Sequence, residues 1–287
     1  MDSLRPMRFG FKTAPQHTTW GAMLEVWRAA DDIDFYESGW TFDHFYPIFS
    51  DSTGNCLEGW TATTALAQAT RRLRVGVLVT GMPYRHPAVL ANMAATLDII
   101  SDGRLELGLG AGWNEEEAGA YGIDIHATLT DRFDAFDEGL EAIVGLLTNE
   151  TTTMQGRFVQ LTDAMCNPKP VQQPHPPIVI GGSGERRTLR SVARYAQHWN
   201  FPGGTPEFFL QKRAVLAQHC DAIGRDVNEI VTSTHLRFGD DGDLAALVEQ
   251  TEQMAAAGLT YGIVTLSPRH GPDVLEPIAN ALDRLRG

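Results

Sequence analysis

Two pairs of neighbouring residues and one glycine-rich turn carry the groups that could do chemistry in this chain. Asp43 and His44 adjoin in FDHF, and a histidine tuned by a neighbouring carboxylate can donate a proton or hydrogen-bond to a ring. Trp113 and Asn114 follow the glycine-threaded run RLELGLGAG and offer a wall and a hydrogen-bonding arm to a pocket. The turn 181–184, GGSG, precedes a helix, where free N–H groups and the helix dipole attract anions. We expect these turns to converge on one site.

Each feature also has a purely structural interpretation. His44 would then cap the end of a strand, Trp113 would pack at a rim, and the turn would be an ordinary connection. In the functional interpretation, positive charge at the turn comes from Arg186, Arg187 and Arg190. The turn matches neither the Walker loop nor GxGxxG, no serine or cysteine lies in a nucleophile motif, and no histidine–carboxylate spacing indicates a metal.

The composition bounds the class of protein. With 43% hydrophobic and 21% charged residues, this is an ordinary globular chain, and 287 residues suit one α/β barrel. The net charge of −13 argues against general nucleic-acid binding. No apolar run approaches the roughly 18 residues of a membrane span. The N-terminal segment has no apolar h-region, and Cys56, Cys166 and Cys220 show no CxxC spacing, so we expect reduced cysteines in a cytoplasmic protein.

About eight apolar, strand-like runs alternate with segments of helical periodicity. The runs span residues 7–12, 39–43, 73–80, 105–109, 177–182, 198–201, 230–238 and 259–266. This alternation predicts an α/β fold, a (β/α)₈ TIM barrel forming a single domain over residues 1–287, with a doubly wound sheet as the alternative. Residues 151–176 break the rhythm. They predict an insertion before strand five, made of a hairpin and the proline-rich tether NPKPVQQPHPP.

Four segments together resemble the bacterial luciferase-like superfamily of flavin- or F420-dependent oxidoreductases. They are FDHF, RHPAVLANMAATLDIISDGRLELGLGAGWNEEEAGAYG, PPIVIGGSGERRTL and AQHWN. The resemblance covers roughly residues 8–200 and continues weakly beyond. Its middle segment is the most specific and is most similar to the group described as F420-dependent.

The resemblance implies a barrel, often dimeric, with the deazaflavin or flavin ring across the C-terminal mouth. It implies a non-prolyl cis peptide behind the ring, here at Leu78-Val79 or Val79-Thr80, and His44 as the catalytic acid, base or ring-polarising residue, with Trp113 in the substrate wall. The implied cofactor-binding residues are Asp43, Leu78, Val79, Thr80, Ala111, Gly112, Asn114, Gly181, Gly182, Ser183 and Gly184, and the sequence adds Arg187.

Two departures from the family pattern refine this expectation. The catalytic Glu of F420-dependent glucose-6-phosphate dehydrogenases after the fourth strand is replaced by Trp113, which argues against a sugar phosphate. The Arg that FMN relatives place near Ala111 is absent, which favours F420 over FMN. The loops 13–20, 45–57 and 239–243 are expected to shape the substrate pocket, and aromatic residues in 45–57 hint at an uncharged, partly apolar ligand.

We therefore predict an oxidoreductase that transfers a hydride between coenzyme F420 and a small organic substrate, acting as a homodimer. An FMN-dependent monooxygenase that uses reduced flavin and O₂ is the first alternative, and a non-catalytic flavin-binding dimer is the second. A phosphate-binding barrel aldolase or isomerase would need a lysine or carboxylate at a strand end, for which the mouth offers Lys12 and Asp43.

Overall fold

A computed structural model describes residues 6–286 and shows a closed barrel of parallel strands. The barrel strands are β1 (Arg8–Thr13), β2 (Ser38–Thr41), β3 (Arg74–Val77), β5 (Leu105–Gly110), β8 (Ile178–Gly181), β9 (His198–Phe201), β10 (Val231–Phe238) and β11 (Tyr261–Leu266). Pairing of β3 with β5 closes the sheet, and the short β4 (Thr80–Gly81) continues the third strand along β5. The TIM-barrel prediction is confirmed and the open doubly wound sheet is wrong. The single-domain prediction includes residues 1–5 and 287, which lie outside the described residues.

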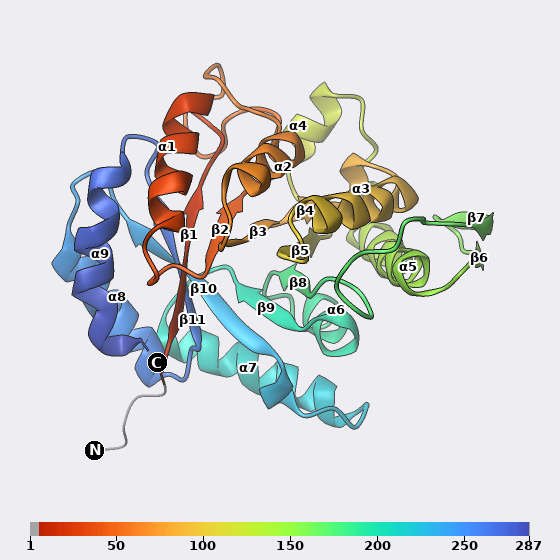
Figure 1. Ribbon diagram of the computed structural model, residues 1–287. Helices are drawn as coiled ribbons and strands as arrows, with labels where there is room; N and C mark the ends of the chain where they lie inside the picture. The colour runs from red at the N-terminus through yellow and green to blue at the C-terminus, as the bar shows by residue number, and fades with distance from the viewer. Residues whose placement is uncertain (1–5, 287) are drawn as a thin grey trace.

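Helices surround the barrel (Figure 1). They are α1 (Trp20–Asp31), α2 (Gly59–Ala69), α3 (Pro87–Ile100), α4 (Glu115–Ala120), α5 (Leu129–Thr148), α6 (Thr188–Tyr195), α7 (Pro206–Asp221), α8 (Leu244–Ala256) and α9 (Leu275–Leu282). Short 3₁₀ helices occupy Met82–Tyr84, Val227–Glu229, Pro272–Val274 and Asp283–Leu285. Polar caps fix several starts: the Thr19 hydroxyl accepts from the Ala22 N–H, and Pro87 opens α3, where it loses no hydrogen bond. Within the described residues, no helix is long and apolar enough to cross a membrane.

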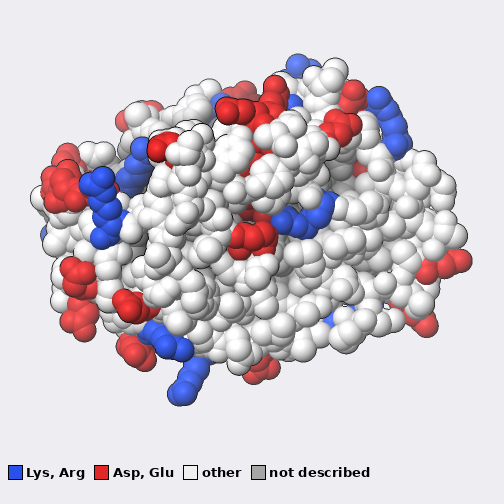
Figure 2. All heavy atoms as spheres, turned by 90° about the horizontal axis from the view of Figure 1, so that it is seen from above, with Lys and Arg blue, Asp and Glu red and all other residues white. Residues whose placement is uncertain are grey.

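Apolar packing divides into two clusters. The larger cluster lies between barrel and helices and includes Phe9, Phe11 and Trp27, all fully buried. The smaller cluster joins Trp40, Leu78, Val179 and Ile263, and because these come from neighbouring and opposite strands it fills the barrel interior. The interior is therefore a packed core beneath the mouth. The surface differs in character: acidic and basic groups intermingle on the face seen in Figure 2, without a basic field of the kind that binds nucleic acids.

A buried polar chain also crosses the barrel interior. Arg74 donates to Glu106 (2.8 Å), the other carboxylate oxygen of Glu106 lies 3.2 Å from His198 Nδ1, and His198 Nε2 lies 2.6 Å from the Ser233 hydroxyl. Ser233 in turn accepts from the amide of Asn200 (2.9 Å). Burial alone would raise the pKa of Glu106, but the hydrogen bonds and charges of His198 and Arg74 outweigh it and lower the pKa to about 2.

The insertion forms an antiparallel hairpin of β6 (Thr152–Gln155) and β7 (Gln160–Ala164) before β8, the fifth barrel strand. Glu138 of α5 holds the hairpin turn, because its carboxylate accepts from the backbone N–H groups of residues 157–159. The proline-rich segment after it contains cis peptides at Asn167–Pro168 and Gln173–Pro174. The hairpin therefore packs along α5, outside the barrel (Figure 1).

Replacement of Gly108 by alanine is expected to destabilise the barrel. A Cβ at this position of β5 would lie 1.9 Å from the Val77 carbonyl oxygen of the neighbouring strand, so the backbone must shift. We expect a loss of about 1–3 kcal/mol in urea unfolding followed by circular dichroism. The matched control is Gly119→Ala at an exposed position of α4, where a Cβ meets nothing within 4 Å and helix propensity favours alanine by about 0.5–1 kcal/mol. Equal stability of the two variants would contradict the steric argument.

Candidate functional site

A cavity of about 1080 Å³ opens at the carboxyl ends of the barrel strands. Its size lies at the upper end of the range of about 300–1,000 Å³ for ligand pockets, which suits a cofactor together with a substrate. Most of the residues predicted from the sequence line it: Asp43, His44, Leu78, Val79, Thr80, Ala111, Gly112, Trp113, Gly181 and Gly182. Asn114, Ser183, Gly184 and Arg187 do not belong to the lining. The predicted convergence of the turns is therefore correct for their strand-end residues.

The floor of the cavity is the interrupted third strand. The Leu78–Val79 peptide is cis, at one of the two bonds expected. Val79 projects toward β5 and β8, where Cβ atoms at Gly110 and Gly181 would lie 2.7 and 3.2 Å from its methyl groups. These two glycines therefore make room for Val79. The hydroxyl of Thr80 is engaged with the Trp60 indole N–H, at 3.0 Å.

His44 is paired with a carboxylate that the sequence did not connect to it. Its Nδ1 lies 2.7 Å from an oxygen of Glu117, in the first turn of α4. An ionised carboxylate only accepts hydrogen bonds, so Nδ1 carries the proton and Nε2 is the other functional atom. Nε2 has no hydrogen-bond partner in residues 6–286, and the His44 side chain, 11% exposed, lines the cavity.

Glu117 is fully buried and its hydrogen-bonding capacity is well used. Besides His44, it accepts from the Tyr84 hydroxyl (2.5 Å) and the Phe45 N–H (2.6 Å). Burial raises the pKa of Glu117, but these hydrogen bonds outweigh burial and lower it below its usual value. Burial and the bond to Glu117 raise the pKa of Tyr84. Glu117 is thus an ionised acceptor that fixes the orientation of His44.

Asp43 makes a two-point ion pair with Arg85, at 2.6 and 2.9 Å, and accepts a third hydrogen bond from the Gly81 N–H. Burial raises the pKa of the Asp43 carboxyl group, and the Arg85 guanidinium opposes that effect. The carboxylate borders the cavity, but its charge is balanced within the protein. This arrangement ties the end of β2 to the segment after β4, which makes Asp43 a positioning residue for His44.

Trp113 and Asn114 separate into two roles. Trp113 is 53% exposed at the mouth, stacks on Phe49 with ring centroids 5.5 Å apart, and meets the His44 ring edge-on at 5.5 Å. This position fits the predicted wall. Asn114 caps α4 instead, because its side-chain oxygen accepts from the Glu117 N–H at 3.2 Å. Its cap positions Glu117, while the predicted arm into the cavity is not seen.

A turn over residues 185–187 joins the glycine turn to α6, which has no side-chain cap. Gly182 adopts φ +125°, and its backbone is held by Asn200 and by the Trp199 indole. Among the described residues, the N–H groups of Ser183 and Gly184 have no acceptor. Successive free backbone N–H groups in such a turn are available to an anion.

Arg187 departs from its predicted role. Its guanidinium pairs with Asp134 (2.6 Å) and Asp137 (3.1 Å) of α5, and Arg190 also pairs with Asp137. Arg187 and Arg190 therefore balance carboxylates of the neighbouring helix, while Arg186 is exposed and has no ion pair among the described residues. The Arg187 Nε–H is buried and has no partner among the described residues, so one donor remains next to the turn.

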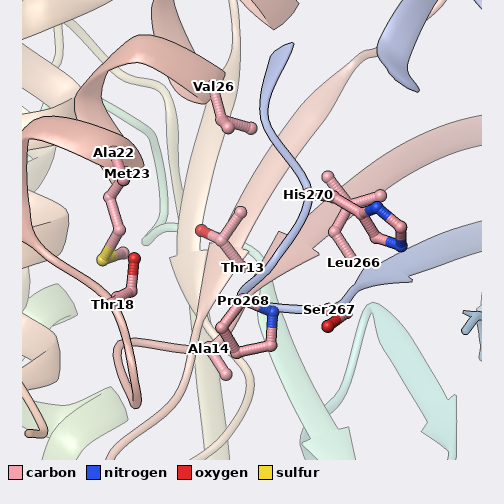
Figure 3. A pocket seen from close by; sticks show the side chains of 10 residues that line it. All are labelled: Thr13, Ala14, Thr18, Ala22, Met23, Val26, Leu266, Ser267, Pro268 and His270. Carbon is pink, nitrogen blue, oxygen red and sulfur yellow. The ribbon is translucent and has the colours of Figure 1, made fainter. Parts of the chain in front are cut away.

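A second, much smaller pocket adjoins the cavity between α1 and the segment after β11 (Figure 3). It measures about 20 Å³, enough for one water-sized group. Leu266, Ser267 and Pro268 line both pockets. The candidate site for a cofactor and a substrate is therefore the large cavity.

Comparison with known proteins identifies the family. The family profile described as luciferase-like monooxygenase matches residues 7–262. The chain belongs to this family. An uncharacterized protein of Mycobacterium tuberculosis is 35% identical over 144 residues, 50% of this chain and 49% of that protein, so the match spans about half the length of such curated relatives. An F420-dependent glucose-6-phosphate dehydrogenase of Microbacterium testaceum is 28% identical over 280 residues, covering 96% of this chain and 81% of that protein.

Solved structures show the same fold as this luciferase-like chain. An F420-dependent secondary alcohol dehydrogenase in complex with an F420-acetone adduct has a TM-score of 0.85 at 17% identity, covering 97% of this chain and 99% of that one. A monooxygenase from Streptomyces bottropensis has a TM-score of 0.81 at 18% identity, with coverages of 97% and 99%. At these identities the likeness establishes the barrel, and the reaction must be argued from the site.

The sequence did not point to several residues of this candidate site. Glu117 was one of three acidic residues suited to a helix start, and nothing in the spacing connects it to His44, 73 residues away. Lys12 was named only as a strand-end lysine for another chemistry, and Asn200 and His235, which also line the cavity, were not singled out. Strand alternation is the signal that places all three at barrel-interior positions. No group of three or more potential metal ligands occurs in residues 6–286.

Proposed function

We propose that this protein is an F420-dependent oxidoreductase that transfers a hydride between F420 and a small organic substrate. The observation that carries the proposal is the His44–Glu117 pair, with Nδ1 held at 2.7 Å and Nε2 unpartnered at a large cavity. A deazaflavin supplies or accepts a hydride when bound, so the protein must hold the ring, hold the substrate and move one proton.

The residues present fit such a cofactor. Val79 and its supporting glycines form a floor against which a flat ring can lie, and a Cβ at Gly110 would disturb that floor. The N–H groups of Ser183 and Gly184 and the orphan Arg187 Nε–H suit a phosphate. The ring would then lie in the cavity beside β4, and the phosphate would reach past Gly181 and Gly182 to the turn before α6.

His44 would transfer the proton that accompanies the hydride. Reduction of a carbonyl group creates an alkoxide that needs a proton, and oxidation of an alcohol releases one. Nε2 can give or take that proton, while Glu117 stabilises the imidazolium that forms and keeps the ring oriented. Trp113 and Phe49 are exposed apolar surface at the mouth, where a partly apolar substrate can be covered. By family resemblance, the working form is a homodimer.

A second candidate is an FMN-dependent monooxygenase. It is favoured by the match to an FMNH(2)-dependent dimethylsulfone monooxygenase of Pseudomonas putida, 28% identical over 206 residues, 70% of this chain and 56% of that protein. The same floor and histidine would serve it. The arginine that FMN relatives place near Ala111 is absent from this chain, which makes this candidate the weaker one.

Parallel anaerobic titrations with F420 and FMN, followed by cofactor fluorescence, test the proposal. We expect F420 to bind at least tenfold more tightly, a difference of about 1.4 kcal/mol. The control is His44→Ala, which should keep F420 affinity because His44 acts on the proton and not on the phosphate. Tighter binding of FMN would contradict the proposal, and oxygen uptake dependent on reduced FMN would then establish the monooxygenase. Binding without any turnover would support a flavin-binding dimer.

A further inference from the structure

The floor of the cavity contains a lysine that the proposed chemistry does not use. Lys12, on the inner face of β1, donates one hydrogen bond to the Leu78 carbonyl oxygen at 3.2 Å. The side chain is only partly accessible, and since Lys12 lines the cavity, its accessible part faces the cavity. An ammonium group carries three donors, so two of them remain for another partner.

No carboxylate pairs with this ammonium group among residues 6–286. Two carboxylates line the cavity, and both are engaged elsewhere: Asp43 pairs with Arg85, and Asp240 pairs with Arg269 and accepts from the Ser267 hydroxyl. Burial without a counter-charge lowers the pKa of Lys12 to about 8. A lysine in this situation is costly to the fold and is characteristic of functional sites.

The strands beside β1 provide no negative charge either. Lys12 registers with Thr265 of β11, whose hydroxyl lies 3.3 Å from His235 Nδ1 on β10. Burial, with the charges of Lys12 and Arg237, holds the pKa of His235 well below its usual value. Lys12, Thr265 and His235 therefore form a polar, neutral-to-positive side of the cavity, and the missing charge has to come from a bound molecule.

We infer that Lys12 binds an anionic oxygen of a molecule held on the floor of the cavity. The oxygen belongs either to the edge of the cofactor ring, which gains negative charge on reduction, or to a substrate carboxylate. The inference adds a binding residue to the proposed function. It depends on the proposed function only for the identity of the cofactor. The inference also changes the sequence-based expectation of an uncharged ligand. The aromatic loop 45–57 at the mouth suits an apolar part of the ligand, and Lys12 below it suits a negatively charged part.

The test compares the wild type with Lys12→Met, which keeps the length and loses the charge, and with Lys12→Arg, which keeps the charge. Oxidised and reduced F420 and FMN are titrated anaerobically into each protein. A charge-assisted hydrogen bond is worth about 1.5–3 kcal/mol, or about 10–100-fold in affinity. If the cofactor supplies the oxygen, Lys12→Met weakens binding of the reduced form at least tenfold more than that of the oxidised form, and Lys12→Arg retains most of the affinity.

If the substrate supplies the oxygen, cofactor affinity is unchanged in Lys12→Met. Calorimetric titration of the cofactor-loaded protein with benzoate then shows binding to the wild type and at least a tenfold loss in the variant, while neutral benzamide binds both alike. Equal affinities of wild type and Lys12→Met for both cofactors in both redox states and for benzoate would overturn the inference. Thermal melting checks that each variant is folded. If neither cofactor binds the wild type, the proposed function fails, and the benzoate arm without cofactor still tests Lys12.

Discussion

His44→Ala is expected to lower the rate of F420-linked turnover by about 10²–10⁴-fold, the range for loss of a general acid or base. The substitution removes an imidazole whose Nε2 is unpartnered among the described residues and whose Nδ1 is held by the Glu117 carboxylate at the edge of the cavity. F420 affinity should change little, because His44 lies opposite the glycine turn. Stopped-flow absorbance of F420 under anaerobic conditions separates the two quantities.

Glu117→Gln tests the His44–Glu117 pair by changing the carboxylate instead of the imidazole. An amide in place of the buried carboxylate cannot stabilise an imidazolium and cannot accept all three short hydrogen bonds. We expect at least a tenfold loss of rate, less than for His44→Ala. The matched control is Glu116→Gln, an exposed neighbour in the same helix, which should react like the wild type. Wild-type rates for both His44→Ala and Glu117→Gln would refute the assignment.

Glu106→Gln is expected to cost about 3 kcal/mol of unfolding free energy at pH 7. The carboxyl pKa falls from 4.5 to about 2 on folding, and 2.5 units correspond to about 3 kcal/mol. Because the folded pKa is the lower one, this stabilisation is complete above about pH 4.5 and disappears as the pH falls toward about 2. The substitution also leaves Arg74 and His198 without their shared carboxylate.

Urea unfolding of wild type and Glu106→Gln at several pH values measures this contribution. The difference should be largest near neutrality and shrink on acidification through that window. Glu150→Gln serves as the control, because Glu150 is exposed and has no side-chain hydrogen bond among the described residues. A difference that stays constant between pH 7 and pH 3 would show that the charge of Glu106 does not contribute.

The barrel was predictable because its signals are local. Buried parallel strands are continuous apolar runs, and most runs in the sequence lie within a residue or two of strands in the structure. The run 73–80 is the exception: it was expected as one strand, and the structure interrupts it at Leu78–Val79 between β3 and β4. Hydrophobic periodicity in a sequence indicates which residues are buried, but not whether a peptide bond is cis or trans. Only the family resemblance therefore pointed to this interruption.

The site was predictable only in part, because its decisive contacts join distant segments. Strand ends placed Asp43 and His44 at the mouth, but their partners Arg85 and Glu117 lie 42 and 73 residues away. For Arg187, contacts with a distant segment removed a predicted role instead of adding one. Its position next to the glycine turn in the sequence suggested a guanidinium available to a ligand, but Asp134 and Asp137 of α5 pair with that guanidinium.

The ion pairs between α5 and α6 affect how strongly salt would change the binding of an anion at the glycine turn. Arg187 and Arg190 face Asp134 and Asp137, so these four formal charges cancel, and exposed Arg186 is the cation beside the glycine turn without an ion pair among the described residues. An anion at this turn is then held by oriented N–H dipoles at short range, with little long-range field to draw it in. Dissolved salt screens long-range fields over about 10 Å at 0.1 M and acts weakly on contacts of this kind. If the proposed phosphate site at this turn is correct, we expect its affinity to depend only weakly on salt concentration.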